Sequence, residues 1–364
     1  MQEYHFTSES VTDGHPDKVC DQIADAILDA ALSQDPESKM AVEATIKDDL
    51  ILVYGEANTK AVLDFTKIAK SVLKDIGYTE DYQVLVKVGL QSYEINQAVV
   101  NHSEIGAGDQ GIMFGYASNE TSNYMPLAID MAHKLAKRLS DYKHENPLIK
   151  PDGKTQVTVL YRDDVPVAIT SIVVSTQHSK DLKLSELRRL IKLEVIDKVV
   201  DPKWITEETT YTINPGGTFI VGGSFGDSGT TGRKIVVDTY GGMGKIGGGC
   251  FSSKDPSKVD RSAAYYCRYV AKNIVANHLA DRCEIQVSYA IGLSRPLSLY
   301  INTFNTNHVS VAEIERIVDL NFNFSVANII SALDLKKPIY RATSVYGHFG
   351  KDQFSWEKII QLRK

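Results

Sequence analysis

The stretch MAVEATIKDDLILVY, residues 40–54, decides the fold that this chain predicts. Apolar and polar residues alternate over 40–46, and a second apolar run covers 50–54, as in two β-strands that bury one face. The pair Asp48-Asp49 between the runs is a turn signal that predicts a hairpin. An antiparallel hairpin with one apolar face needs helices to cover that face.

Helical patterns flank this hairpin on both sides. Val19, Ile23 and Ile27 recur at helical spacing and predict an amphipathic helix over 17–33. A second helix is predicted over 59–76, where Gly77 can end it, and a further strand over 83–88. This first unit therefore has the order helix, hairpin, helix, extended segment.

The same order returns twice along the chain. The second unit is predicted as a helix over 126–142, strands over 155–161 and 167–175 with a turn at 163–164, a helix over 184–200 and a strand over 209–213. The third is predicted as a helix over 261–279, strands over 284–291 and 297–303, and a helix over 311–321. We expect an α+β fold of three similar domains, each a β-sheet packed with helices. The domains are predicted over 1–100, 104–221 and 223–360, as sequence segments that can exchange parts in space.

Composition argues against several classes of protein. The formal net charge of −6 gives no support to nucleic-acid binding, and apolar runs such as 169–174 are far too short to span a membrane. The polar start of the chain does not look like a secretory signal. The four cysteines contain no C-x-x-C pair, which argues against a zinc cluster or a redox dithiol. Reduced thiols in a cytoplasmic protein are expected.

Residues suited to chemistry gather in three loops, each placed before the first helix of a unit. They are SESVTDGHPDK at 8–18, GAGDQG at 106–111, and the tract 216–260. Glycine lets a backbone approach a ligand closely, and the free N–H groups of a helix N-terminus suit phosphates.

The last of these loops is the most unusual. Thirteen of the chain's 25 glycines fall between 216 and 249, which would suit a flexible linker. The tract also contains an apolar run, 235–237, that predicts a buried strand. It interleaves basic and acidic residues, namely Arg233, Lys234, Lys245, Lys254 and Lys258 with Asp227, Asp238, Asp255 and Asp260. Basic groups neutralise phosphate oxygens and carboxylates hold Mg²⁺, so we expect a polyphosphate-binding surface.

Two other readings of the glycine-rich tract are open to comparison. The segment GDSGTTGRK, 226–234, lacks the spacing of a P-loop. The segment GMGKIG, 242–247, matches G-x-G-x-x-G and would suggest a nicotinamide-dependent oxidoreductase, but no helix is predicted to begin inside it. A non-enzymatic binding or scaffold protein is a further alternative. The concentration of His, Asp, Lys and Gly in three loops favours an enzyme over it.

At these loops the chain resembles the S-adenosylmethionine synthetase (methionine adenosyltransferase) family. The segments GAGDQGIMFGY at 106–116 and GGGCFSSKD at 247–255 are similar to the two family signatures. Further similar segments are SESVTDGHPDK at 8–18, TGRK at 231–234, DTYGG at 238–242, DPSKVDRS at 255–262, QVSYAIG at 286–292 and YGHFG at 346–350. The resemblance runs from the first residues to about residue 356.

The resemblance implies a fold, a reaction and an assembly. The fold is that of the family, with three similar α+β domains. In the reaction, the sulfur of L-methionine attacks C5′ of ATP and expels triphosphate, which is then hydrolysed to diphosphate and phosphate. The expected protein is a transferase of one-carbon metabolism, in the cytoplasm, with no nucleic acid and no membrane as partner. The expected assembly is a homodimer with shared active sites, paired into a homotetramer.

The resemblance also implies roles for individual residues. Catalytic roles fall to His15, Lys154, Arg233, Lys234 and Lys254. Contacts with ATP fall to these five residues together with Asp152, Phe219, Asp227 and Cys250. Contacts with methionine fall to Glu56, Gln91, Asp227 and Lys258. Asp17 and Asp260 would bind two Mg²⁺ per site, Glu43 would bind K⁺, and Asp109 would shape the site. Several of the lysines would reach in from the partner subunit.

Three departures from the family pattern lie close to these positions. The segment 91–104 resembles a lid over the site, but it begins QSYEI where QSPDI is common, and it is shorter. Loss of the proline should loosen the turn and alter lid dynamics. Ser228 stands where cysteine is common near the potassium region, and Thr218 replaces a commoner arginine beside Phe219. Ser228 therefore leaves the potassium dependence open, and Thr218 predicts a different contact with the edge of the adenine.

Overall fold

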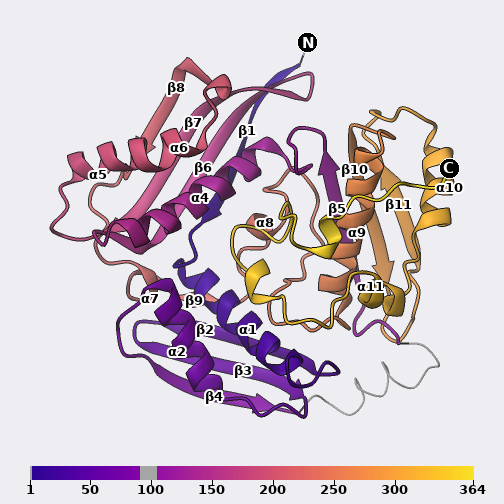
Figure 1. The fold of residues 1–364 in the computed structure, drawn as a ribbon, viewed down its shortest axis with the longest axis horizontal. Helices are drawn as coiled ribbons and strands as arrows, with labels where there is room; N and C mark the ends of the chain where they lie inside the picture. Colours follow the sequence, from indigo (N-terminus) through magenta and orange to yellow (C-terminus); the bar gives the residue numbers. More distant parts are fainter. Residues whose placement is uncertain (1, 91–104) are drawn as a thin grey trace.

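The computed structural model describes residues 2–90 and 105–364, and its strands form three separate sheets (Figure 1). One sheet has the order β4-β3-β2-β9. Its strands are β2 (Lys39–Lys47), β3 (Leu50–Asn58), β4 (Gln83–Gly89) and the short β9 (Gly229–Thr230). The helices α1 (Pro16–Leu32) and α2 (Phe65–Ile76) pack on it. The hairpin predicted from residues 40–54 is present, with its turn at Asp48 and Asp49.

A second sheet has the order β1-β6-β7-β8. Its strands are β1 (Glu3–Val11), β6 (Ile149–Arg162), β7 (Val165–His178) and β8 (Ile205–Ile213). The covering helices are α4 (Leu127–Glu145), α5 (Leu184–Ile191) and α6 (Asp197–Val199), the last two joined by a π-helical turn, Lys192–Ile196.

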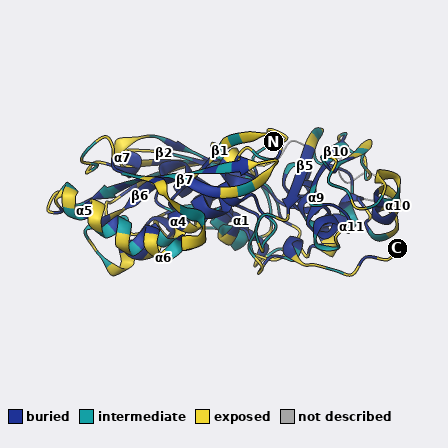
Figure 2. Ribbon diagram, turned by 90° about the horizontal axis from the view of Figure 1, so that it is seen from above, coloured by how far each residue is buried: buried dark blue, intermediate teal, exposed yellow. Residues whose placement is uncertain are grey.

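The third sheet has the order β11-β10-β5. Its strands are β5 (Gly111–Ser118), β10 (Arg282–Tyr289) and β11 (Ser298–Asn302), with the helices α9 (Val259–Ala276), α10 (Val311–Asn321) and α11 (Val326–Ala332). Both α9 and β5 are buried along most of their length (Figure 2). Gly115 permits their close approach, because a Cβ there would lie 2.1 Å from the carbonyl carbon of Cys267.

The predicted repeat holds for two units and is wrong for the end of the third. In the first two, the last strand runs parallel to the second strand of the hairpin, β4 beside β3 and β8 beside β7. In the third, helix α10 is followed by α11, and the described residues after it form no further strand. The apolar segment 326–332 packs as a helix into the core instead.

Each sheet also takes a strand from a distant part of the chain. The N-terminal β1 pairs with β6, β5 pairs with β10, and β9 pairs with β2, all antiparallel. The α+β class and the sheets packed with helices are confirmed. In space, however, the sheets interleave the three sequence segments.

Several local predictions need correction. The apolar run 235–237 is not a strand but the start of the short helix α8 (Ile235–Asp238), because only Val237 of the three is buried and Asp238 N donates to Lys234 O at 2.8 Å. The helix predicted from 59 begins at Phe65, where Asp64 caps it. The loop 8–18 is partly strand, since residues 8–11 belong to β1. The loop 106–111 leads into strand β5 and not directly into a helix.

Two apolar cores hold the described residues together. One lies under the first and third sheets and includes α1 and α9, and the other lies under the second sheet with α4. The first core also encloses charge: Glu357 is fully buried between Arg268 and Lys272, at 2.9 and 2.8 Å. Among the described residues we find no helix long and apolar enough to cross a membrane.

Candidate active site

A cavity of about 280 Å³ opens where the first turn of α1 meets the second sheet. Five residues predicted to act on ATP line it, although up to 212 positions separate them along the chain, namely His15, Asp152, Lys154, Phe219 and Asp227. The other lining residues are Pro16, Ser175, Val221, Gly222 and Gly226. The cavity thus joins a helix N-terminus, strands β6 and β7, and the start of the glycine-rich tract, which includes the short helix α7 (Gly223–Gly226).

His15 is the N-cap residue of α1 and is buried. Its backbone is extended, and its Nδ1 accepts a hydrogen bond from Asp17 N at 3.2 Å. Burial and the charge of Lys234 lower the pKa of His15 to about 3, so the ring is neutral at pH 7. Because Nδ1 is an acceptor in this geometry, the neutral ring carries its proton on Nε2. Nε2–H is therefore available as a donor.

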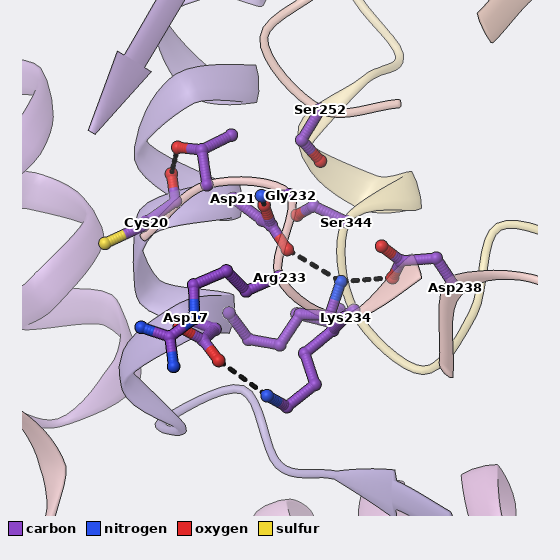
Figure 3. A network of polar contacts seen from close by, with 12 residues as sticks. Asp17, Cys20, Asp21, Gly232, Arg233, Lys234, Asp238, Ser252 and Ser344 are labelled. Carbon is purple, nitrogen blue, oxygen red and sulfur yellow. Dashed lines mark hydrogen bonds and ion pairs between the residues drawn. The ribbon is translucent and has the colours of Figure 1, made fainter. Parts of the chain in front are cut away.

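Asp17, two residues further on, is the centre of a cluster of opposite charges (Figure 3). Lys234 Nζ lies 2.5 Å from Asp17 Oδ2, and Arg233 Nε lies 3.5 Å from Asp17 Oδ1. Asp17 Oδ1 also accepts from Thr230 N at 3.0 Å. Burial favours the neutral acid, but the hydrogen bond and charge of Lys234 outweigh it and lower the pKa of Asp17. The cluster places Lys234 beside His15, while Arg233 lies beside the other oxygen of Asp17.

Asp152 supplies a buried carboxylate on the opposite wall, from strand β6. Its Oδ2 accepts from Gly223 N at 2.9 Å. Burial raises the pKa of Asp152 to about 6, against the lowering effects of Gly223 N and Lys154. Asp152 lines the cavity, so a ligand bound there can reach its carboxylate.

Phe219 and Asp227 complete the wall made by the glycine-rich tract. Phe219 is half-buried, and its backbone is held on both sides by His178: Phe219 N donates to His178 Nε2 at 3.2 Å, and His178 N donates to Phe219 O at 2.8 Å. Asp227 is exposed, and its Oδ1 accepts from Ser228 N at 2.8 Å. An aromatic ring and a free carboxylate oxygen thus face the same cavity.

A second group of predicted residues lies outside this cavity. Lys254 Nζ is 2.5 Å from Asp260 Oδ2, and Lys258 Nζ is 2.5 Å from Asp255 Oδ2. Cys250, which was also predicted to contact ATP, lies beside Gly232, the residue before Arg233. A Cβ on Gly232 would lie 2.7 Å from Cys250 Sγ. The chain brings Lys254, Lys258 and Asp260 together, but apart from His15.

The remaining predicted positions are scattered. Glu43 on β2 is half-buried and accepts from Tyr54 Oη at 3.2 Å, and Glu56 on β3 is exposed. Asp109 is also exposed, and its Oδ1 accepts from Gln110 N at 2.7 Å. Gln91 and the lid predicted over 91–104 lie outside the described residues.

The carboxylates suit Mg²⁺ that is shared with a polyphosphate better than a metal held by protein alone. Among the described residues there is no group of three or more His, Cys, Asp or Glu side chains that could enclose an ion. Asp17 and Asp260 instead each stand singly beside a lysine. Mg²⁺ commonly takes one or two carboxylates and completes its shell with water and substrate phosphates, so this donor set fits it.

Some lining residues were not found by sequence reasoning. Ser175 lies in an ordinary strand pattern, and only the pairing of β6 with β7 brings it next to Lys154. Val221 and Gly226 lie in the glycine-rich tract, but nothing in the sequence marks these two residues individually. In contrast, the segment 242–247 is a turn with no helix starting in it, so the oxidoreductase reading is not supported. The fingerprint for dinucleotides needs that helix.

Comparison with known proteins finds the same family along the whole chain. Family models of S-adenosylmethionine synthetase match the chain in three parts: the N-terminal domain at 3–104, the central domain at 104–219 and the C-terminal domain at 221–358. An S-adenosylmethionine synthase of Sorangium cellulosum (strain So ce56) is 50% identical over 378 residues, covering 100% of this chain and 90% of the relative. One from Staphylococcus epidermidis (strain ATCC 12228) is 50% identical over 382 residues, covering 98% and 96%.

Proposed function

This chain belongs to the S-adenosylmethionine synthetase family. We propose that it catalyses a two-step reaction in which the residues described above bind the substrates and stabilise the leaving group. The enzyme makes S-adenosylmethionine from ATP and L-methionine. In the first proposed step the methionine sulfur forms a bond to C5′ of ATP, and the C5′–O bond to the triphosphate breaks. In the second, water cleaves the bound triphosphate to diphosphate and phosphate.

The observation that carries this proposal is the cavity that joins His15, Lys154 and Asp152 beside Arg233 and Lys234. A triphosphate is strongly anionic, and that charge is matched by Lys154 and Lys234 near the neutral His15 and by Arg233 beside Asp17. Phe219 offers a ring for the adenine, and Asp152 and Asp227 offer carboxylates for hydroxyl or ammonium groups. Ligand pockets of this kind combine apolar walls with a few placed polar groups.

The chemistry assigns most of the catalysis to charge stabilisation. A thioether sulfur is neutral and carries no proton to remove, so the first step needs no general base. Negative charge grows on the departing oxygen, and a donor placed there lowers the barrier. The Nε2–H of neutral His15 is suited to this role because the ring gives no proton away at pH 7. Lys154, Arg233 and Lys234 would hold the rest of the triphosphate.

Metal ions would share that charge. Asp17 and Asp260 are the proposed Mg²⁺ ligands, and bound Mg²⁺ would neutralise phosphate oxygens of the substrate. Glu43 is the proposed K⁺ ligand, supported by a half-buried carboxylate next to Tyr54. Ser228 stands near this position where cysteine is common in the family, so the strength of the potassium requirement has to be measured.

The second group of residues supports a shared site. Lys254, Lys258, Glu56 and Asp260 do not line the cavity of their own chain, and Glu56 is exposed. We propose that they complete the site of a partner subunit in a homodimer, with Glu56, Gln91, Asp227 and Lys258 binding methionine. Cys250 and Lys254 would complete the ATP contacts. Pairing into a tetramer and a cytoplasmic location stay predictions.

The test is a product balance. Purified protein is incubated with ATP, L-methionine, Mg²⁺ and K⁺, and S-adenosylmethionine, diphosphate and phosphate are measured separately. Equal amounts of the three products support both steps. S-adenosylmethionine with intact triphosphate would contradict the second step alone, and no S-adenosylmethionine from a folded sample would contradict the proposal.

The KM for ATP should rise as the pH falls through about 6. Asp152 has a pKa of about 6, so at pH 5 about nine-tenths of its carboxyls are protonated and accept hydrogen bonds poorly. The expected change is several-fold between pH 7 and pH 5, with the KM for methionine as internal reference. Asp152→Asn, which cannot titrate, should show a higher KM at pH 7 and no further rise from this group. An identical pH profile in the variant would contradict the role of Asp152.

Gly249→Ala should weaken the response to Mg²⁺. A Cβ at this position would lie 2.4 Å from Asp260 Oδ2 and would push the carboxylate aside. Displacement of a metal ligand commonly costs about tenfold or more in metal affinity. The measurement is the Mg²⁺ concentration for half-maximal activity. Gly216→Ala is the matched control, since nothing lies within 4 Å of its added Cβ. Equal Mg²⁺ responses in both variants would argue against Asp260 as a ligand.

A further inference from the structure

The first helix carries a buried lysine directly after the proposed Mg²⁺ ligand. Lys18 is 0% exposed, and its ammonium group donates to Asp21 Oδ2 at 2.9 Å and to Asp238 Oδ1. Asp21 and Asp238, both labelled in Figure 3, thus share this one ammonium group. A buried cation between two buried carboxylates is costly to assemble, so its geometry should be fixed tightly once formed.

Asp21 ties this ion group to the glycine-rich tract. Its second oxygen, Oδ1, accepts from Gly232 N at 2.8 Å. Asp17 and Asp21 stand one turn apart on the same face of α1, and Asp17 Oδ1 accepts from Thr230 N in the same way. Between them, Thr231 N donates to Ala44 O at 3.0 Å. Three successive backbone donors are therefore held against α1 and β2, immediately before Arg233 and Lys234.

Asp238 holds the other end of the same segment. Its backbone N donates to Lys234 O at 2.8 Å, and its carbonyl accepts from His348 N at 2.9 Å. The segment 232–238 is thus fixed at Gly232 through Asp21 and at its last residue through Lys18. Gly232 has φ +79° and abuts Cys250, so this anchor point has little freedom to relax.

We propose that Lys18 is a positioning residue for the triphosphate: by joining Asp21 and Asp238, it clamps both ends of segment 232–238 and so places Arg233 and Lys234 beside Asp17 and His15. The inference rests on the proposed role of Arg233 and Lys234 as triphosphate ligands. Lys18 itself is fully buried and does not line the cavity. It acts through the backbone that carries the two cations.

The test compares Lys18→Met with Glu357→Gln in the intact protein. Glu357 is the charge-reversed counterpart, one buried carboxylate between Arg268 and Lys272, and none of the three lines the cavity. Lys18→Met leaves two buried carboxylates without their cation, and Glu357→Gln leaves two buried cations without their carboxylate. Both variants should therefore lower Tm. For the folded fraction, Lys18→Met should lose at least tenfold in kcat and at least tenfold in affinity for inorganic triphosphate, with the KM for methionine within twofold. Glu357→Gln should keep wild-type values. Equal kinetics in the two variants would overturn the proposal.

A second pair remains informative where Lys18→Met does not fold. Asp21→Asn and Asp21→Ala both remove one negative charge and leave Lys18 paired with Asp238, but only the amide oxygen of the first can still accept from Gly232 N. The alanine variant should bind inorganic triphosphate at least fivefold more weakly than the asparagine variant. Equal affinities would overturn the proposal. Lys234→Met serves as the separate check: wild-type triphosphate binding in that variant would mean that the proposed site, and not the clamp, is wrong.

Discussion

His15→Asn is expected to keep the fold and to lose about 100- to 1,000-fold in kcat for S-adenosylmethionine formation. Asparagine is a good N-cap, and its side-chain oxygen can replace Nδ1 as the acceptor for Asp17 N. It is too short to present a donor where Nε2–H lies. Removal of one donor from developing negative charge costs a factor of that size. The measurement is single-turnover formation of S-adenosylmethionine by mass spectrometry, with circular dichroism and Tm as checks on the fold.

A matched variant separates the donor from the imidazole ring. Glutamine at position 15 is one carbon longer than asparagine and can carry an N–H nearer to the position of Nε2. His15→Gln should therefore recover part of the activity that His15→Asn loses. Because the pKa of His15 is about 3, wild-type activity above pH 5 should show no step from this group. A folded and fully active His15→Asn protein would remove His15 from the mechanism.

The fold was predictable where local pattern and tertiary burial agree. The helix over 17–33 and the hairpin over 40–54 carry clear periodicities, and α1 (Pro16–Leu32) and the pair β2–β3 match them. Strands β1 and β5 were missed because their identity as strands depends on partners far along the chain. Val11 pairs with Lys154 and Tyr116 with Glu284. The run 235–237 was misread because three apolar residues do not distinguish a strand from a short helix.

The candidate site also contains residues that the sequence identifies and residues that only the tertiary fold reveals. The five residues around the cavity were found because they stand inside long motifs that resemble a family, and no periodicity would have singled out Asp152 or Phe219. The buried ion group was not predicted, since a Lys and an Asp three residues apart on a helix are ordinarily exposed to solvent. Its other carboxylate, on Asp238, lies 220 positions away from Lys18. Burial of that kind is decided by the tertiary fold alone.

Lys234→Met is expected to lose about 100-fold in kcat and to weaken binding of inorganic triphosphate. The substitution removes a cation that stands 2.5 Å from Asp17 Oδ2 and beside His15, so charge on the departing triphosphate loses one stabilising partner. It also removes the main influence that lowers the pKa of Asp17, leaving Arg233 at 3.5 Å and Thr230 N to hold that carboxylate. A carboxyl group whose pKa is lower in the folded than in the unfolded protein stabilises the fold at pH values above its unfolded pKa. Part of the stability at pH 7 should therefore be lost in the variant, while at pH values below the folded pKa of Asp17 the difference should vanish.

The control for this prediction is Lys245→Met in the same glycine-rich tract. Lys245 is 62% exposed and pairs with Glu284 at 2.9 Å, away from His15 and Asp17. Lys245 does not line the cavity, so this variant should keep wild-type kcat and triphosphate affinity. Its Tm should fall, because the buried carboxylate of Glu284 loses its cation and keeps only the backbone N–H of Lys245 as a donor. If the two variants behaved alike, simple loss of positive charge would explain the result. If only Lys234→Met loses kcat and triphosphate affinity while the KM for methionine stays constant, the effect belongs to the leaving group, because the attacking sulfur is neutral and gains nothing from a nearby cation.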